Sequence, residues 1–506
     1  MFVLKAKRSY IFSRTLMLLN RVLRFILTCK RNTTKMRYIL RSYTFILMFC
    51  TGIGFLQAQY LKVSDNDRYL VTDDDKPFFW LADTAWELFH RLSITEAETY
   101  LKTRKAQGFT VIQAVILAEI NGLTTPTPEG DFPLIDQDVA RPNEDYFKKV
   151  DKIIKIAASY GLYMAVLPTW GSHAQDVEHY LFDNLNLFNK DNAYQYGKFL
   201  GERYKEQCNV VWVLGGDRMP ESTEKIWTPM AKGLNAGSGG QQLLTYHPNG
   251  IHSTVEFSEK FPWLGFHSFQ SGHSQENYPV YTMVAAAYTK RPTMPVLNME
   301  PSYEYIGKGF NPINGYYTDY DSRKAAYWSV FAGAFGHTYG HNCVWQMWSS
   351  KHRPILYADI PWYKAIHSVG SYQMHHIKDL MLSRPFKSRI PDQSIILSDI
   401  GIQSDYTCAT RDGNLGKNDA TYIMVYLPVI KNFKINTTVI SGKKIKVWWF
   451  NPRNGIAFFQ GEYDNTGTFS QIWGNRIDKN MGGPDWVLVI DDATKKYDFN
   501  LLSENF

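Results

Sequence analysis

The sequence predicts an α/β protein, a (β/α)8 TIM barrel followed by a small all-β sandwich domain. Between Phe78 and about Trp348, eight short apolar runs alternate with segments of helical periodicity. This alternation favours a parallel barrel over an open sheet. Beyond about Ser383 the pattern changes to short alternating runs separated by Gly, Asn, Asp and Pro, which is typical of a β-sandwich.

The eight strand candidates are residues 78–83, 110–117, 163–168, 210–216, 243–248, 263–269, 295–301 and, less clearly, 336–345. A capping box of Thr95 and Glu98 predicts a helix that ends before Gly108. Apolar residues repeat at helical spacing in 147–158 and 196–204, as expected for helices between strands. No Gly-x-Gly-x-x-Gly sequence follows a predicted strand, so we expect no dinucleotide and no other cofactor.

The first 59 residues carry the chain's positive charge. They contain 11 Lys or Arg and no acidic residue, which leaves 44 basic against 48 acidic residues, a net charge of −4, for the rest. Nucleic acid is therefore not an expected partner. From Met36, a basic segment, an apolar run and Ala58 form the pattern of a secretory signal peptide. The apolar run is shorter than the ~20 residues of a membrane span, so we expect a secreted or periplasmic protein without stable membrane insertion.

This organisation predicts three parts. Residues 1–59 form an upstream extension and signal peptide, residues 60–385 the catalytic barrel, and residues 386–506 the C-terminal β-sandwich domain. In the last part Trp448, Trp449 and Phe450 follow one another, so alternate rings face opposite sides of a strand. We expect at least one of these rings to pack on the barrel.

Cysteine and histidine patterns disfavour two classes of enzyme. Cys208, Cys343 and Cys408 are far apart in the remaining chain and make neither a disulfide framework nor a zinc site. His337 and His341 lie in a Gly-rich, strand-like stretch, and no His-x-His pair follows the first strand, so we expect no metal. A serine hydrolase is disfavoured because no Gly-x-Ser-x-Gly elbow accompanies the histidines.

Two carboxylates stand at the ends of predicted strands. The run from Val210 ends in Gly-Gly-Asp217, and the run from Pro295 ends at Glu300. In a barrel, residues just beyond the strands converge on one face, so the pair would flank a bond in the way that glycoside hydrolysis requires. An Asp in a Gly-rich turn often only stabilises the turn by bonding its own backbone. Glu300, which precedes Pro301, is also compatible with a surface position. Their joint placement favours catalysis.

Other polar and aromatic residues near predicted strand ends fit a ring-lined pocket for an oligo- or polysaccharide. Each one alone is equally compatible with packing or with a structural hydrogen bond. The candidates for substrate binding are Asp83, Trp86, Gln113, Trp170, His173, Tyr246, His247, His267, Tyr303, His337, Tyr339 and Trp345.

Four segments carry a family resemblance: "FFWLADTAWELFHRL", "VVWVLGGDRMP", "NMEPSYE" and "VWWFNPRNG". In this order they resemble the apiosidase-like glycoside hydrolases of family 140, which join a barrel to a small β-domain labelled collagen-binding. The resemblance implies a secreted bacterial enzyme that cleaves apiose-containing side chains of the pectin rhamnogalacturonan II. It also implies that Asp217 and Glu300 are the catalytic carboxylates. Asp217 departs from better-known retaining barrels, which usually carry Glu after strand four.

Asp217 and Glu300 follow the fourth and seventh predicted strands, and this placement resembles that of the carboxyl pair in retaining barrel glycosidases. We therefore expect a separation of roughly 5 to 5.5 Å, with Glu300 as nucleophile and Asp217 as acid/base, whereas inversion requires about 6.5 to 9.5 Å. To act as an acid, Asp217 needs a raised pKa. The alternative is a binding protein that kept the fold and lost turnover. The sequence leaves open the sugar, exo or endo action and the oligomeric state.

Overall fold

A computed structural model describes residues 59–174, 186–221, 223–472 and 484–499. The expected upstream extension and signal peptide lie outside these residues, apart from Gln59. Within the described ranges, no helix is both long enough and apolar enough to cross a membrane.

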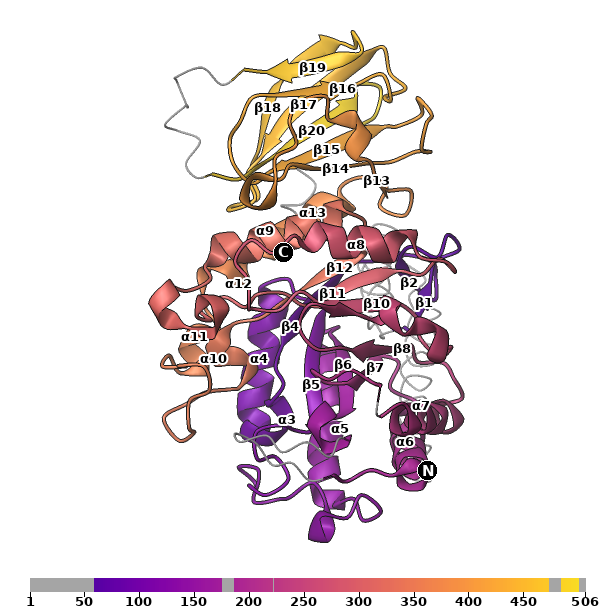
Figure 1. Ribbon diagram of the computed structural model, residues 1–506, viewed down its shortest axis with the longest axis vertical. Coiled ribbons are helices and arrows are strands. Elements are labelled where there is room, and N and C mark those ends of the chain that lie inside the picture. The colour runs from indigo at the N-terminus through magenta and orange to yellow at the C-terminus, as the bar shows by residue number, and fades with distance from the viewer. Residues whose placement is uncertain (1–58, 175–185, 222, 473–483, 500–506) are drawn as a thin grey trace, which may run out of the picture. The chain divides into compact units, whose positions relative to one another are not determined.

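All eight predicted barrel strands form, and they are parallel (Figure 1). They are β4 (Trp80–Thr84), β5 (Val111–Leu117), β6 (Tyr163–Thr169), β7 (Val210–Gly215), β8 (Leu244–His247), β10 (His267–Gln270), β11 (Val296–Glu300) and β12 (Gly336–Tyr339). Their order in the sheet is β8-β7-β6-β5-β4-β12-β11-β10. The N–H of Gly265 donates a 2.7 Å hydrogen bond to the carbonyl of Leu244, which links the two ends of this order. The predicted barrel is confirmed.

Helices follow the strands and supply the outer layer (Figure 1). They are α3 (Leu88–Arg91), α4 (Ile94–Ala106), α5 (Glu144–Ser159), α6 (Lys190–Tyr204), α7 (Glu224–Ser238), α8 (Val280–Thr289), α9 (Asp319–Phe331), α10 (Asn342–Trp345), α11 (Trp362–Ala365), α12 (Val369–Gln373) and α13 (His375–Leu382). Single turns of 3-10 helix are η1 (Ile135–Gln137), η2 (Gly171–Ala174), η3 (Thr254–Glu256), η4 (Ser258–Lys260), η5 (Lys308–Phe310), η6 (Pro312–Asn314), η7 (Gln393–Ile395) and η8 (Gln403–Asp405).

The capping box of α4 is not the predicted one. Ser93 is the N-cap, and its hydroxyl accepts from the N–H of Glu96, whose carboxylate accepts from the N–H of Ser93. The predicted box of Thr95 and Glu98 is therefore wrong by two residues. Both pairs have the required spacing, but Ser93 holds the extended backbone of a cap, whereas Thr95 already lies in the first turn.

Strand alternation separates the barrel interior from the helix layer. In β5, Ile112, Ala114 and Ile116 pack in the same buried cluster as residues of α4 and α5. Gln113 points the other way, and its side chain donates a 3.2 Å hydrogen bond to the carbonyl of Met299 on β11. The side chains that support the site are therefore held by a packed interior.

Smaller sheets complete the fold. Before the barrel lie β1 (Leu61–Val63), β2 (Leu70–Thr72) and β3 (Pro77–Phe78), and β9 (His252–Ser253) pairs antiparallel with β10. The C-terminal part contains β13 (Ile390–Pro391), β14 (Cys408–Arg411), β15 (Tyr422–Leu427), β16 (Phe433–Asn436), β17 (Lys444–Phe450), β18 (Ala457–Asp464), β19 (Thr468–Gln471) and β20 (Trp486–Asp492). Six of these strands form one sheet, in the order β13-β14-β15-β20-β17-β18, and β16 pairs with β19. The all-β character predicted for this part is confirmed.

The β-domain is joined to α9 by charged and aromatic contacts. Asp485 is fully buried, and its carboxylate receives Arg323 at 2.9 Å and Arg453 at 2.8 Å. The rings of Tyr327 and Tyr426 stack at a centroid distance of 4.8 Å. Phe450 belongs to the same buried cluster as Tyr327, and its ring stacks on Phe499.

Candidate active site

The turn after β7 explains the Gly-Gly-Asp sequence. Gly215, Gly216 and Asp217 all have positive φ angles, of 83°, 116° and 57°. A Cβ atom on Gly215 would lie 2.6 Å from the carbonyl oxygen of His247, and one on Gly216 would lie 2.7 Å from the backbone nitrogen of Gly171. Only glycine fits both positions, whereas Asp tolerates the left-handed region. The two glycines let the strand turn sharply and place the Asp217 carboxyl in a cleft.

The cleft has a volume of about 500 Å³. It lies beyond the carboxyl ends of several barrel strands, where active sites of this fold are found. Its lining residues are Trp86, Glu119, Trp170, Asp217, Arg218, Asn249, Gly250, Ile251, Gln270, Gly272, His273, Ser274, Glu300, Tyr303, Ile306, Phe310, Trp345, Ile355 and Leu356. Both expected catalytic carboxylates are among them.

Two imidazole rings hold the carboxylate of Glu300. Nε2 of His273 lies 2.9 Å from Oε1, and Nε2 of His247 lies 3.0 Å from Oε2. On the far side of each ring, Nδ1 accepts a backbone N–H, from Tyr303 to His273 at 3.2 Å and from Asp217 to His247 at 3.3 Å. Because each Nδ1 accepts, the proton of each ring is on Nε2. From His273 it is donated to Oε1 of Glu300, whereas Nε2 of His247 lies close to Oε2 without the geometry of a hydrogen bond.

These contacts separate the titration of the two carboxyl groups. Burial would raise the pKa of Glu300, but its contacts with His247 and His273 outweigh burial and lower this pKa to about 2. Burial and then the charge of Glu300 raise the pKa of Asp217. The cleft thus pairs an ionised carboxylate with a carboxyl group that retains its proton more readily, which is the division that acid and nucleophile need.

Four of the twelve expected substrate contacts line the cleft: Trp86, Trp170, Tyr303 and Trp345. The rings of Trp86 and Trp170 lie 5.4 Å apart, and that of Trp86 lies 5.5 Å from His247. His247 does not line the cleft itself. It lies between the Trp86 ring and the Glu300 carboxylate. Aromatic faces beside two carboxyl groups suit a sugar ring, which stacks on aromatic surfaces.

Of the eight other expected contacts, His247 lies against Glu300 behind the lining, and the structure places the remaining seven away from the cleft. Asp83 faces α4, where its carboxylate accepts from Arg104 at 2.6 Å and also from Tyr100. Tyr339 donates a 2.6 Å hydrogen bond to Glu304. The remaining five are buried: Gln113, His173, Tyr246, His267 and His337. Of these, Tyr246 donates to the carbonyl of Arg218, and His173 and His267 contact Thr169 and Thr254.

Several lining residues were not singled out from the sequence. His273 lies three residues beyond β10, and Glu119 lies two residues beyond β5. Arg218 directly follows Asp217, and its guanidinium donates to the Asp217 carbonyl at 2.7 Å. Their position just past a strand end was the available signal. Asp217 is preceded by a Gly-Gly pair, whereas Glu119 has no such pair before it.

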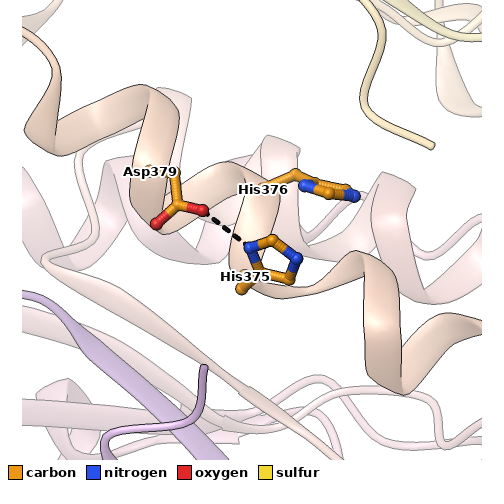
Figure 2. A group of neighbouring side chains, drawn as sticks. All are labelled: His375, His376 and Asp379. Atoms are coloured by element: carbon orange, nitrogen blue, oxygen red, sulfur yellow. Dashed lines mark hydrogen bonds and ion pairs between the residues drawn. The ribbon is translucent and has the colours of Figure 1, made fainter. Parts of the chain in front are cut away.

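Among the described residues, one group has a geometry suited to a metal ion, and it lies outside the cleft lining. It consists of His375, His376 and Asp379 on α13 (Figure 2). Figure 2 shows the His375 ring bonded to the Asp379 carboxylate, at 2.6 Å. Burial lowers the pKa of His376 to about 3. The His375–Asp379 hydrogen bond holds these two side chains together on α13.

The cleft and its carboxyl pair agree with comparisons to known proteins. Residues 64–388 match the family described as "Apiosidase-like, catalytic domain". The chain belongs to this family. Residues 390–491 match "Putative collagen-binding domain of a collagenase". A search of curated proteins returns no match.

Solved structures similar to this apiosidase-like protein are glycoside hydrolases. One, titled "Glycoside hydrolase", is 34% identical with a TM-score of 0.78, and the match covers 87% of this chain and 98% of the other. A glycoside hydrolase family 5 protein from Bacteroides vulgatus is 33% identical with a TM-score of 0.77, covering 87% and 94%. The protein is accordingly a glycosidase with an apiosidase-like catalytic domain.

Proposed function

We propose that the protein is a secreted, retaining glycosidase that releases apiose from side chains of a pectic glycan. One observation carries the two-carboxyl mechanism: His247 and His273 lower the pKa of Glu300 in the cleft, while the pKa of Asp217 is raised. Retention is proposed because the pair follows the fourth and seventh barrel strands, as in retaining barrel glycosidases. The sugar follows from the apiosidase-like family. Export follows from the signal pattern that begins at Met36.

In the first step Glu300 attacks the anomeric carbon of the bound sugar. The bond from this carbon to the leaving oxygen breaks, and Asp217 transfers its proton to that oxygen, so the aglycone departs as an alcohol. The negative charge on Glu300 is consumed as the ester forms. His247 and His273 keep the attacking carboxylate oriented before this step, because both of its oxygens are held.

In the second step the sugar is released from Glu300. Asp217, now a carboxylate, takes a proton from water while the water oxygen attacks the anomeric carbon. The bond to Glu300 breaks, the sugar leaves with its original anomeric configuration, and Asp217 is again protonated. With Glu300 bound as a neutral ester, the charge that raised the pKa of Asp217 is absent, which favours its action as a base at this stage.

Product stereochemistry tests this proposal directly. The purified protein from Tyr60 onward is incubated with apiose-containing pectic oligosaccharides, and the first product anomer is followed by proton NMR. Retention with release of apiose is the expected result, and the Glu300→Gln variant serves as the inactive control. First-formed product of inverted configuration would overturn the retaining mechanism. Binding without turnover by the wild type would instead support the non-catalytic alternative.

Export is tested separately. When the full-length gene is expressed in a Gram-negative host, N-terminal sequencing of the exported protein should give a start near Gln59 or Tyr60. A mature protein that begins upstream of Met36 would contradict the proposed signal peptide.

A further inference from the structure

A third carboxyl group, that of Glu119, lines the cleft with Asp217 and Glu300. Glu119 follows β5, the second barrel strand, so it reaches the cleft from a different element than either member of the catalytic pair. The two-step reaction described above uses only two carboxyl groups. The third therefore has no assigned chemistry, although it shares the cleft where the substrate is expected.

Glu119 is buried but has no partner for its carboxyl group. It is 8% exposed. Within the described ranges, no side chain or backbone group donates a hydrogen bond to this carboxyl, and no cation lies within ion-pair distance of it. The carboxyl oxygens are open to the cleft although the rest of the side chain is buried. A ligand that fills the cleft therefore meets a carboxyl group that no group of the described residues engages.

The charges around Glu119 determine what it can bind. Burial and then the charges of Asp217 and Glu87 raise the pKa of Glu119 well above its ordinary value, with a smaller contribution from Glu300, and the opposing charge of Arg218 does not outweigh them. Glu87 is itself buried and hydrogen bonded to His90 at 2.7 Å. An uncharged carboxyl group offers one O–H donor together with an accepting oxygen. A sugar hydroxyl, which both donates and accepts, is a matching partner.

We propose that Glu119 is a substrate-contact residue, and that its carboxyl group exchanges hydrogen bonds with a hydroxyl group of the sugar in the cleft. The inference rests on the proposed glycosidase function, because it takes a sugar as the occupant. It adds a residue that binds the sugar without forming or breaking a covalent bond. Wild-type affinity should then depend on Glu119 keeping its proton.

Two substitutions separate this role from its alternatives. Glu119→Gln retains an N–H donor and an accepting oxygen without charge, whereas Glu119→Ala removes both. The alanine variant should raise KM about tenfold, the effect of losing one or two hydrogen bonds to a ligand. The glutamine variant should stay within about threefold of the wild type. In addition, the wild-type KM should rise with increasing pH as Glu119 ionises, while that of Glu119→Gln should not show this rise.

Sugar binding is measured alongside turnover so that the two proposals can fail separately. D-apiose and a panel of neutral monosaccharides are titrated against each variant by tryptophan fluorescence, because Trp86, Trp170 and Trp345 line the cleft. Wild-type binding that Glu119→Ala weakens supports the contact even if the wild type proves inactive, in which case only the proposed function fails.

Three results would overturn the contact. The first is an active wild type whose KM and sugar affinity are unchanged in Glu119→Ala. The second is equal loss in the alanine and glutamine variants with a flat wild-type pH profile, which would indicate a structural role. The third is a wild type that binds and hydrolyses none of the sugars.

Discussion

The substitution His273→Ala should move the acidic limb of the profile of kcat/KM against pH to higher pH. Its Nε2–H is one of two donors to Glu300, at 2.9 Å. A hydrogen bond to a charged group contributes about 1.5–3 kcal/mol, and one pKa unit corresponds to about 1.36 kcal/mol. Loss of this donor in His273→Ala should therefore raise the pKa of Glu300 from about 2 by roughly one to two units.

The measurement is kcat/KM against pH, because this ratio reports the ionisation of groups in the free enzyme. The profile should be recorded from about pH 2.5 to 8 at constant ionic strength, with circular dichroism at each pH to show that the variant stays folded. His273→Gln is the matched control, since its amide can donate to Glu300 and accept from the N–H of Tyr303. We expect the acidic limb of the His273→Ala profile to shift to higher pH. The limb of the His273→Gln profile should move less than half as far.

An unshifted limb in a folded, weakened His273→Ala variant would refute this reasoning. It would mean that His273 orients Glu300 or the backbone of Tyr303 without stabilising the negative charge. The low pKa of Glu300 would then have to come from His247, whose Nε2 lies 3.0 Å from the carboxylate. The proposed explanation for the ionised nucleophile would lose one of its two contacts.

Three further predictions concern the carboxyl groups. Glu300→Gln should abolish turnover of every substrate, whereas Asp217→Asn should still release activated leaving groups such as nitrophenol, as measured by single-substrate kinetics; substantial activity in the first variant would contradict the nucleophile assignment. The folded-state pKa of Asp217 is raised above 3.8, so its contribution to stability is present below that pH and is lost as pH rises through the folded pKa. Asp217→Asn should therefore melt a few degrees higher than wild type at pH 8 and no higher at pH 3.5, by calorimetry. Asp485→Ala removes the buried carboxylate that Arg323 and Arg453 share, leaving Asp319 as the ion-pair partner of Arg323. It should cost up to about 3–5 kcal/mol in chemical unfolding, against under about 1 kcal/mol for the exposed Asp136→Ala; equal losses would contradict the burial argument.

Much of the fold could be predicted because local sequence and strand order determine it. Eight apolar runs separated by helical segments specify a barrel, and its parallel strands bring the residues that follow them to one rim. That placement is enough to predict that Asp217 and Glu300 share a cleft, although they are 83 positions apart in the sequence. The Gly-Gly pair before Asp217 is likewise a local signal, because its φ angles depend on the absence of side chains.

Only the tertiary structure decided which other side chains face the substrate. The strand expected at 263–269 runs from His267 to Gln270, so His267 lies at the start of β10 and His273 lies beyond its end, against Glu300. Asp83, like Asp217, stands near the end of a predicted strand, yet it faces α4 and pairs with Arg104. A shift of one residue reverses the face of a strand side chain, and a shift of a few residues moves it from one end of the barrel to the other. Apolar patterns locate a strand only to within such a shift, whereas packing against neighbouring strands and helices fixes it.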